Sequence, residues 1–260
     1  MASTFLTLPA KIITPNGMRD LETRIIGETT LTIIFNDVPL ATSACCGLHL
    51  QELAVGFLFA EGYIVGKEDL SSVSVEDGAD AGKYTARVTG VARRALKEDG
   101  GCYTILSSGA KTTLTEERKA IFPEATATIS PQEITPLFDA LVKGAAIHNA
   151  TRGTHSGGIV SKGNILVIRE DIGRHNVADM LVGYALLNGI ALADKCVVRT
   201  GRVSLEIATK YRRAGIVILL SLSVPTLGAI DYAKSNGMCL ISAQRNKEPI
   251  VYCGHERVGE

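Results

Sequence analysis

The chain has 260 residues, of which 46% are hydrophobic, and its 27 lysine and arginine residues equal its 27 aspartate and glutamate residues. This composition predicts a globular protein with a substantial core, and its balanced charge excludes an overall field that would attract nucleic acid or an acidic membrane. No stretch reaches the ~20 apolar residues of a membrane-spanning helix, and the first residues lack the pattern of a secretory signal. We therefore expect a cytoplasmic protein without nucleic-acid or membrane partners, whose six cysteines are reduced.

The first hundred residues are predicted to form a small α+β unit. Apolar residues alternate from Asp20 to Phe35 around a Gly-Glu pair, which indicates a hairpin. Residues 49–61 place apolar side chains at helical spacing and end before a glycine, so a helix that packs inward is expected there. Two further short strands are predicted within residues 71–90, on either side of a turn-rich segment.

Residues 100–129 interrupt this periodicity. The segment is rich in glycine, serine and threonine, and loops of this length within a compact domain are usually functional or disordered. We therefore predict a domain boundary here. The smaller α+β domain would span residues 1–125 and end in the long loop, and a second domain would span residues 126–260.

The second domain is predicted to be α/β, with a mixed, largely parallel sheet. It opens with a helix that runs from a capping box at Ser130 to about His148. After a hairpin, strands alternate with helical stretches of roughly ten to fifteen residues, the pattern of right-handed β-α-β crossovers. The predicted strands are HSGGIV, ILVIRE, KCVVRT, IVILLSLS, MCLIS and PIVYC.

Three junctions between a strand and a helix collect polar side chains suited to an anion. Open α/β sheets bind ligands at the carboxyl ends of their strands, and glycine, arginine and a helix N-terminus together suit phosphate oxygens. No junction is a Walker loop or a GxGxxG motif, but their coincidence favours a nucleotide-like anion. The third junction, at residues 223–226, offers hydroxyl groups. The candidate ligand residues at the other two and on the neighbouring strand are His155, Ser156, Arg169, Asp171, Gly173, Arg174, His175, Thr200, Gly201 and Arg202.

A purely structural role for the first junction stays open. Asp171 would then cap the helix, and His175 would be an ordinary helix residue. Arg169 and Glu170 would be solvated, because caps and surface charges are common where helices begin.

Several motifs together resemble the formate dehydrogenase accessory protein (FdhD/NarQ) family. They are THSGGIV, ILVIREDIGRHNVADMLVG and TGRVSLEIATKYRRAG in the second half, and ELAVGFLFAEGYI in the first. The resemblance covers nearly the whole chain, and it implies a cytidine-deaminase-like fold for the second domain and a homodimer. It also implies a sulfurtransferase role. Family members carry sulfur, as a persulfide, from a cysteine desulfurase to the molybdenum bis(molybdopterin guanine dinucleotide) cofactor before its insertion into formate dehydrogenase.

The resemblance further implies that a segment near the C-terminus binds this client cofactor. Arg245 and Lys247 would meet its phosphates. The alternative is a polar hairpin turn. By position the segment corresponds to Ala243, Gln244, Arg245, Asn246, Lys247 and Glu248.

The carrier of sulfur is less evident, because the family usually uses a C-x-x-C loop and this chain has none. In the corresponding segment, GGCYTILSSGAK, only Cys102 remains, and it aligns either with the first family cysteine or as a strand residue. A persulfide needs one thiolate, so Cys102 is the candidate catalytic residue. The alternative function is a scaffold that binds the cofactor without sulfur transfer.

The other cysteines offer one competing hypothesis. Cys45 and Cys46 precede a predicted helix, whose N-terminus would favour a thiolate, although a pair of buried small residues is the simpler interpretation. Cys196, Cys239 and Cys253 fall in or beside apolar strands and are expected in the core. No metal site is expected, because a zinc deaminase needs His-x-Glu and Pro-Cys-x-x-Cys motifs and neither occurs.

Overall fold

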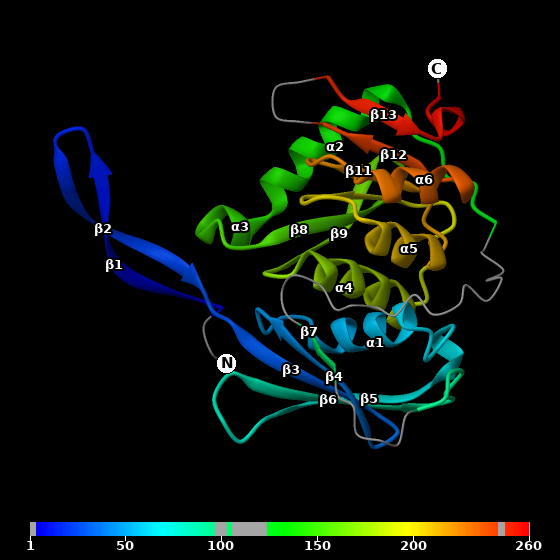
Figure 1. Cartoon of the computed structure of the whole chain (residues 1–260), viewed down its shortest axis with the longest axis horizontal. Coiled ribbons are helices and arrows are strands. Elements are labelled where there is room, and N and C mark those ends of the chain that lie inside the picture. The colour runs from blue at the N-terminus through cyan, green and yellow to red at the C-terminus, as the bar shows by residue number, and fades with distance from the viewer. Residues whose placement is uncertain (1–3, 97–102, 106–123, 244–247, 260) are drawn as a thin grey trace.

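The computed structural model (Figure 1) describes residues 4–96, 103–105, 124–243 and 248–259. Two sheets lie on opposite sides of the body, with helices between them. α1 (Leu50–Ala60) covers the sheet of the first half and α4 (Arg174–Leu187) covers that of the second. α2 (Pro131–Gly144) lies on the outer face of the second sheet, so the layers are sheet, helix, helix, sheet, helix.

The sheet of the first half has the strand order β5-β6-β3-β4-β7. Its strands are β3 (Thr29–Phe35), β4 (Val38–Cys45), β5 (Leu70–Asp77), β6 (Lys83–Gly90) and β7 (Tyr103–Ile105), with a short 3-10 helix at Lys67–Asp69. The two strands predicted within residues 71–90 are confirmed as the antiparallel pair β5–β6.

The hairpin predicted between Asp20 and Phe35 is wrong in its pairing. β2 (Gly17–Ile26) pairs instead with β1 (Phe5–Thr14), and β3 pairs with β4. The turns explain this choice, because Asn36 and Asp37 have positive φ angles of 48 and 64, the geometry that two-residue hairpin turns require. The Gly-Glu pair instead connects a separate ribbon, β1–β2, to the sheet.

Helices α1 and α4 cross with their backbones in contact. A Cβ atom on Gly56 would overlap the carbonyl oxygen of Asp179, and one on Gly183 would overlap the carbonyl oxygen of Glu52. Each glycine therefore lets the other helix approach. The inward-packing helix predicted at residues 49–61 is confirmed, and this crossing joins the two halves.

The second half begins with the predicted capping box. Ser130 N donates to Glu133 Oε2 at 2.9 Å, and Gln132 N donates to Ser130 Oγ at 3.3 Å. The helix does not continue to His148 as predicted, because the chain leaves helical geometry at Ala145, whose ψ is 75. A second short helix, α3 (Ala146–Thr151), follows.

The sheet of the second half is mixed, as predicted, but not largely parallel. Within the described residues its order is β13-β12-β11-β10-β8-β9, and only β10–β11 and β11–β12 are parallel. The tight connection between β8 and β9 forces an antiparallel pair, and β8–β10 and β12–β13 are antiparallel as well. The strands are β8 (His155–Ser161), β9 (Asn164–Asp171), β10 (Cys196–Arg199), β11 (Ile218–Ser221), β12 (Cys239–Ser242) and β13 (Ile250–Cys253).

The predicted helices of this half are present. α5 (Leu205–Arg213) is capped by Ser204, and α6 (Leu227–Ser235) is capped by Thr226. They lie with α4 on the inner face of the sheet, where one hydrophobic core runs through both halves and includes Leu31, Phe57, Met180 and Leu219. A second core lies under α2. The domain boundary near residue 125 stays a prediction. A 3-10 helix at His255–Arg257 ends the described chain, and no described helix is long and apolar enough to cross a membrane.

The glycine crossing generates a stability prediction. Gly56→Ala or Gly183→Ala forces the two helices apart, so each should lower the free energy of unfolding by on the order of 3 kcal/mol. Gly228→Ala in α6 is the matched control, because its new methyl group would meet nothing closer than 3.9 Å. Urea unfolding measures all three. Equal stability of the Gly56 and Gly228 variants would contradict the crossing.

Candidate functional site

The carboxyl ends of β9, β10, β11 and β12 meet at one edge of the second sheet. β9 and β10 both pair antiparallel with β8, which lies between them, so they run in the same direction. β8 therefore begins where they end. The paired residues at this edge include His155 with Asp171, Arg199 with Ser221, and Ser221 with Ser242. The three junctions predicted to meet are brought together.

Arg199 is the central cation of this edge. Arg199 is only 1% exposed, yet no carboxylate in the described part of the chain forms a salt bridge with its guanidinium. Its Nε donates to Thr200 O at 3.2 Å and its Nη2 to Arg174 O at 3.3 Å, while Nη1 has no hydrogen-bond partner among the described residues. Burial lowers the pKa of this guanidinium, and Tyr211, whose ring lies 5.8 Å away, partly opposes that effect. An arginine still remains charged.

Two further groups face the same place. Arg174, the first residue of α4, has a buried Nε without a described hydrogen-bond partner. Gly201 has a φ of +77, and a Cβ there would lie 3.0 Å from His155 Nδ1 and 3.7 Å from Arg174 Cβ. The glycine thus permits the loop after β10 to pack against both. We call Arg174, Arg199 and His155 the cationic cluster.

His155 is neutral at physiological pH. Burial, followed by the charges of Arg199 and Arg174, lowers its pKa to about 4. The cluster therefore combines two permanent positive charges with an uncharged imidazole. Within the described part of the chain, none of its three side chains forms a salt bridge with an aspartate or a glutamate. Such an environment favours an anion.

The remaining residues of these junctions stabilise the edge. Ser156 N donates to Thr200 Oγ1 at 2.9 Å, and Ser156 Oγ donates to Glu170 at 3.3 Å. Arg202 is exposed at the same junction. Helix α4 begins at Arg174, shortly after the end of β9, so the positive end of its dipole also faces this edge. No side chain caps this N-terminus.

Asp171 is committed to internal contacts. Its carboxylate is buried and accepts hydrogen bonds from Cys46 N at 2.8 Å, Gly173 N at 2.8 Å and Asn176 Nδ2 at 2.7 Å. Burial raises the pKa of this carboxyl, and these bonds oppose the shift. Asn176 also donates to Ala44 O at 2.8 Å. Asp171 and Asn176 belong to residues 169–176, the REDIGRHN motif within the run ILVIREDIGRHNVADMLVG. They therefore tie the second sheet to β4.

The structural alternative predicted that Arg169 and Glu170 are solvated, and this prediction is wrong. Arg169 forms a two-pronged ion pair with Glu52 of α1, at 2.5 and 2.7 Å, and its guanidinium lies 4.8 Å from the centroid of the Tyr184 ring. Glu170 accepts from Ile147 N and His148 N at 2.9 and 2.8 Å, capping α3. Both side chains are used inside the protein because they lie between packed elements.

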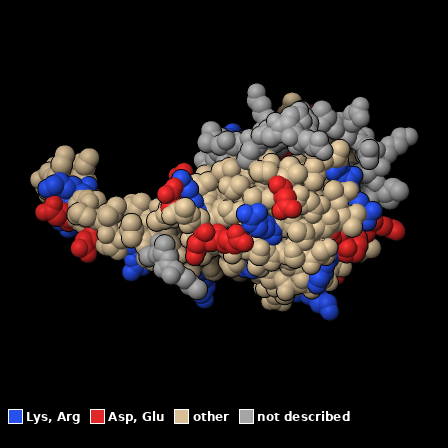
Figure 2. All heavy atoms as spheres, turned by 90° about the horizontal axis from the view of Figure 1, so that it is seen from below, with Lys and Arg blue, Asp and Glu red and all other residues tan. Residues whose placement is uncertain are grey.

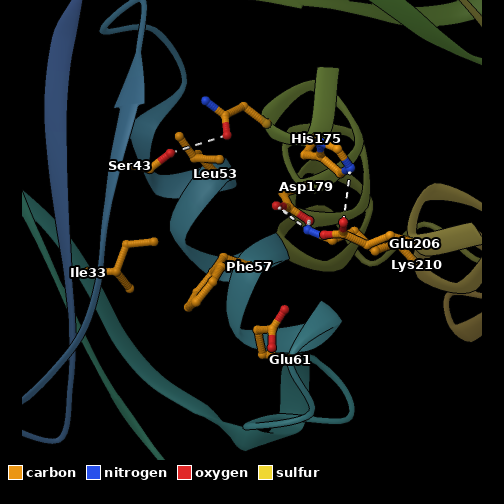
Figure 3. Close-up of a pocket in the computed structure, with 10 residues that line it drawn as sticks. Ile33, Ser43, Leu53, Phe57, Glu61, His175, Asp179, Glu206 and Lys210 are labelled. Carbon is orange, nitrogen blue, oxygen red and sulfur yellow. Dashed lines mark hydrogen bonds and ion pairs between the residues drawn. The ribbon is translucent and has the colours of Figure 1, made fainter. Parts of the chain in front are cut away.

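His175 faces a small cavity between α1, α4 and α5 (Figure 3). Its Nε2 lies 3.2 Å from Glu206 Oε2, and the close-up shows the ring directed at that carboxylate. Deeper in the cavity, Lys210 Nζ lies 2.8 Å from both carboxylate oxygens of Asp179. His175 therefore belongs to a buried polar network beside the cationic cluster.

The predicted C-terminal segment begins at the same edge. Ala243 is buried, and its N donates to Ser221 O at 3.1 Å. Glu248 is exposed. Gln244, Arg245, Asn246 and Lys247 lie outside the described residues.

The described cysteines are poor nucleophiles. Cys45, Cys46, Cys196, Cys239 and Cys253 are buried free thiols. Burial raises the pKa of Cys45 to about 11 and those of Cys196 and Cys239 to about 12, and it also raises that of Cys46, where the Asp171 carboxylate adds to the effect. The burial and raised pKa values of Cys45 and Cys46 oppose the hypothesis of a reactive pair, because a thiol with such a pKa is protonated at neutral pH. Cys102 lies outside the described residues.

Sequence analysis missed Arg199. It was included in a predicted strand, where its charge received no role. A lone arginine ending an otherwise apolar strand is the signal that would have found it. Among the residues described, no three His, Cys, Asp or Glu side chains gather in a way that would hold a metal ion.

Comparison with known proteins places these observations in a family context. A model of the FdhD/NarQ family matches residues 26–259. The "Sulfur carrier protein FdhD" of Listeria innocua is 31% identical over 92% of this chain and 93% of its own, and that of Bacillus subtilis is 30% identical over 92% of each. A crystal structure described as a formate dehydrogenase accessory protein from Desulfotalea psychrophila superposes with a TM-score of 0.82 and 25% identity, covering 99% of this chain and all of that one. This match confirms an α/β fold with mixed sheets, and the cytidine-deaminase likeness stays a prediction.

The cationic cluster generates a prediction about His155. A bound anion favours the imidazolium form, so saturating inorganic pyrophosphate should raise the His155 pKa above its value of about 4. Proton NMR of the imidazole C–H signals, followed downward from neutral pH, measures the shift. The exposed His255 is the internal control, and its signal should not respond. A His155 titration that pyrophosphate leaves unchanged would contradict an anion site here.

Proposed function

The chain belongs to the FdhD/NarQ family, and from that membership we propose that it carries sulfur for the maturation of formate dehydrogenase. The donor is a cysteine desulfurase. The substrate is the molybdenum bis(molybdopterin guanine dinucleotide) cofactor, which is later inserted into formate dehydrogenase. The cationic cluster is the observation that carries this proposal, because it offers a binding site for the phosphates of a dinucleotide.

The buried positive charge of Arg199, which no carboxylate of the described residues neutralises, supports a phosphate site. A guanidinium buried without a carboxylate is destabilising by several kcal/mol, and Arg199 is such a group. A phosphate accepts hydrogen bonds from two arginine nitrogens at once. Arg199 Nη1 and Arg174 Nε are both without a described hydrogen-bond partner, so a diphosphate between them would satisfy both.

The neighbouring loops extend this site. Gly201 lets the backbone approach a ligand closely, and Arg202 is exposed beside it. Ala243, the first residue of the predicted cofactor-binding segment, lies at the same edge after β12. Arg245 and Lys247 of that segment would supply further positive charge.

Sulfur loading needs a single thiolate. In the proposed step, the Cys102 thiolate attacks the outer sulfur of a persulfide on the desulfurase. A new S–S bond forms on Cys102 while the donor cysteine leaves as a thiolate, so electrons and sulfur are conserved. The raised pKa values of the described cysteines oppose any other carrier among them.

The alternative is a scaffold that binds the cofactor but transfers no sulfur. One observation favours it: the sequence contains no C-x-x-C motif, so no second cysteine accompanies Cys102 at that spacing along the chain. Both functions need the phosphate site, and only sulfur transfer needs a persulfide.

Mass spectrometry after incubation with a cysteine desulfurase and L-cysteine separates the two functions. We expect a persulfide on the wild-type chain and on Cys253→Ser, and none on Cys102→Ser. Cys253 is the matched control because it is a buried core thiol. An unmodified wild-type chain would support the scaffold, and a persulfide retained by Cys102→Ser would assign the carrier to another cysteine.

Calorimetric titration with guanosine diphosphate tests the phosphate site. Each of Arg174→Gln and Arg202→Gln should weaken binding about tenfold, because each removes a charge-assisted hydrogen bond. Arg87→Gln, on the exposed side of β6, should bind as the wild type does. Equal affinity for all three variants would contradict the site.

A further inference from the structure

Two polar pairs connect α4 to α5 beside the cationic cluster. His175 Nε2 lies 3.2 Å from Glu206 Oε2, and one turn further along both helices Lys210 Nζ lies 2.8 Å from each carboxylate oxygen of Asp179. Residues four apart share one face of a helix, so the two pairs follow one another along the helices, and Figure 3 shows both of them between α4 and α5. We call His175–Glu206 the outer pair and Asp179–Lys210 the inner pair.

The inner pair is charged at every physiological pH. Asp179 and Lys210 are only 4% and 8% exposed. Burial lowers the pKa of the Lys210 ammonium, but the neighbouring carboxylates, above all that of Asp179, raise it by more, so the net shift is upward. Lys210 therefore keeps its proton, and the attraction within the inner pair does not change near neutral pH.

The outer pair differs because its attraction depends on a proton. Histidine gains or loses its charge near neutral pH, and only the imidazolium form is drawn to a carboxylate by a full charge. His175 is buried, and its contact with Glu206 is within ion-pair distance but is not aligned as a hydrogen bond. Its Nδ1 is also buried without a hydrogen-bond partner among the described residues. In the free protein, His175 thus has hydrogen-bonding capacity that these residues do not use.

The outer pair joins the two helix starts that build the phosphate site. His175 follows Arg174, the first residue of α4. Glu206 lies in the first turn of α5, directly after the loop that carries Gly201 and Arg202. This loop packs against the start of α4, because a Cβ on Gly201 would lie 3.7 Å from Arg174 Cβ. A stronger outer pair would therefore hold the loop and the helix start together.

His175 lies between opposite charges. It lines one cavity with the carboxylates of Glu61, Asp179 and Glu206, which favour the imidazolium form. The neighbouring guanidinium groups of the cationic cluster oppose that form by repulsion. An anion bound to the cluster would offset the repulsion and leave the attraction of the carboxylates in place.

The other charged groups packed around α4 already have partners. Arg169 pairs with Glu52, while Glu170 and Asp171 accept hydrogen bonds from backbone N–H groups. The charged and titratable groups of the surrounding elements are Glu52 and Glu61 at α1, Glu206 and Lys210 on α5, His155 on β8, Arg169, Glu170 and Asp171 on β9, and Arg199 on β10.

We propose that His175 and Glu206 are a positioning pair for the phosphate site, and that His175 takes up a proton when an anion binds there. The imidazolium–carboxylate pair then holds the first turns of α4 and α5 together around the anion. This inference rests on the proposed phosphate site, and it deepens that proposal by coupling anion binding to pH.

The coupling has a definite sign. If anion binding promotes protonation of His175, protonation must strengthen anion binding by the same factor. Affinity therefore rises as the pH falls through the range in which histidine titrates. His155 does not contribute near neutral pH, because its pKa is lowered to about 4 by burial and by the two arginines.

The outer face of the first sheet offers no similar site among the described residues. Figure 2 looks at the molecule from below this sheet and shows basic and acidic side chains interspersed. Along β5 and β6, Lys83 pairs with Asp80 at 2.5 Å and Arg87 with Glu76 at 3.2 Å. An anion would therefore meet matched charges there.

Calorimetric titration of the full chain with guanosine diphosphate, from about pH 8 to about pH 6, tests the coupling. Between these limits the affinity of the wild type should rise about tenfold more than that of His175→Gln. Glutamine keeps an N–H for Glu206 but cannot take up a proton. The nucleotide's own phosphate also titrates near pH 6, and the comparison between variants removes that contribution.

His255→Gln is the matched control. β13 runs antiparallel to β12 and leads away from the phosphate site, so the exposed His255 lies at the opposite edge of the sheet. Its variant should reproduce the pH profile of the wild type. Glu206→Gln removes the carboxylate charge from a side chain that is 23% exposed, and it should lose most of the pH dependence.

Two results would overturn the coupling alone: a shared pH profile for the wild type and His175→Gln, or weaker binding of His175→Gln by the same factor at every pH. The second result would give His175 a purely structural role. Absence of nucleotide binding at every pH would overturn the phosphate site as well. Circular dichroism checks folding, and if His175→Gln does not fold, a wild-type pH profile in Glu206→Gln would overturn the coupling.

Discussion

The backbone contact between α1 and α4 is the constraint on which the rest of the structure depends. Gly56 and Gly183 have no side chains at the crossing, so each helix lies directly against the other. This contact aligns two sheets that would otherwise be separate layers, and one core runs through both. The Arg169–Glu52 ion pair and the Asp171–Asn176 network join the same two halves. Much of the REDIGRHN motif thus serves to build the site rather than to touch a ligand.

This rigid frame makes a buried, unmatched cation possible. Arg199 lies at the end of an apolar strand. Asp171 accepts a hydrogen bond from Gly173 N in the loop before α4, and Gly201 lets the loop after β10 pack against His155. The burial of Arg199 is unfavourable in the free protein, and a bound phosphate would relieve it. The site therefore gains affinity for an anion from charge that the fold has already desolvated. Burial and the charges of Arg199 and Arg174 also lower the pKa of His155. The imidazole is therefore neutral, and the two arginines carry the positive charge of the cluster.

The sequence predicted much of this fold because its local signals were strong. The capping box at Ser130, the apolar strand ILVIRE and the helix at residues 49–61 all formed as expected. Strand pairing was harder to predict. Period-two alternation identifies strands but not their partners, so β2 was matched with β3, and the sheet was expected to be largely parallel. Arg199 was overlooked because its importance comes from a missing carboxylate, which only the packed structure reveals.

The most direct test of the central claim is a crystal structure of the full chain grown with guanosine diphosphate. We predict that the diphosphate lies at the strand-end edge, within hydrogen-bond distance of Arg199 Nη1 and Arg174 Nε, with Gly201 against it. A nucleotide bound elsewhere, with both arginine nitrogens still unpaired, would contradict the account.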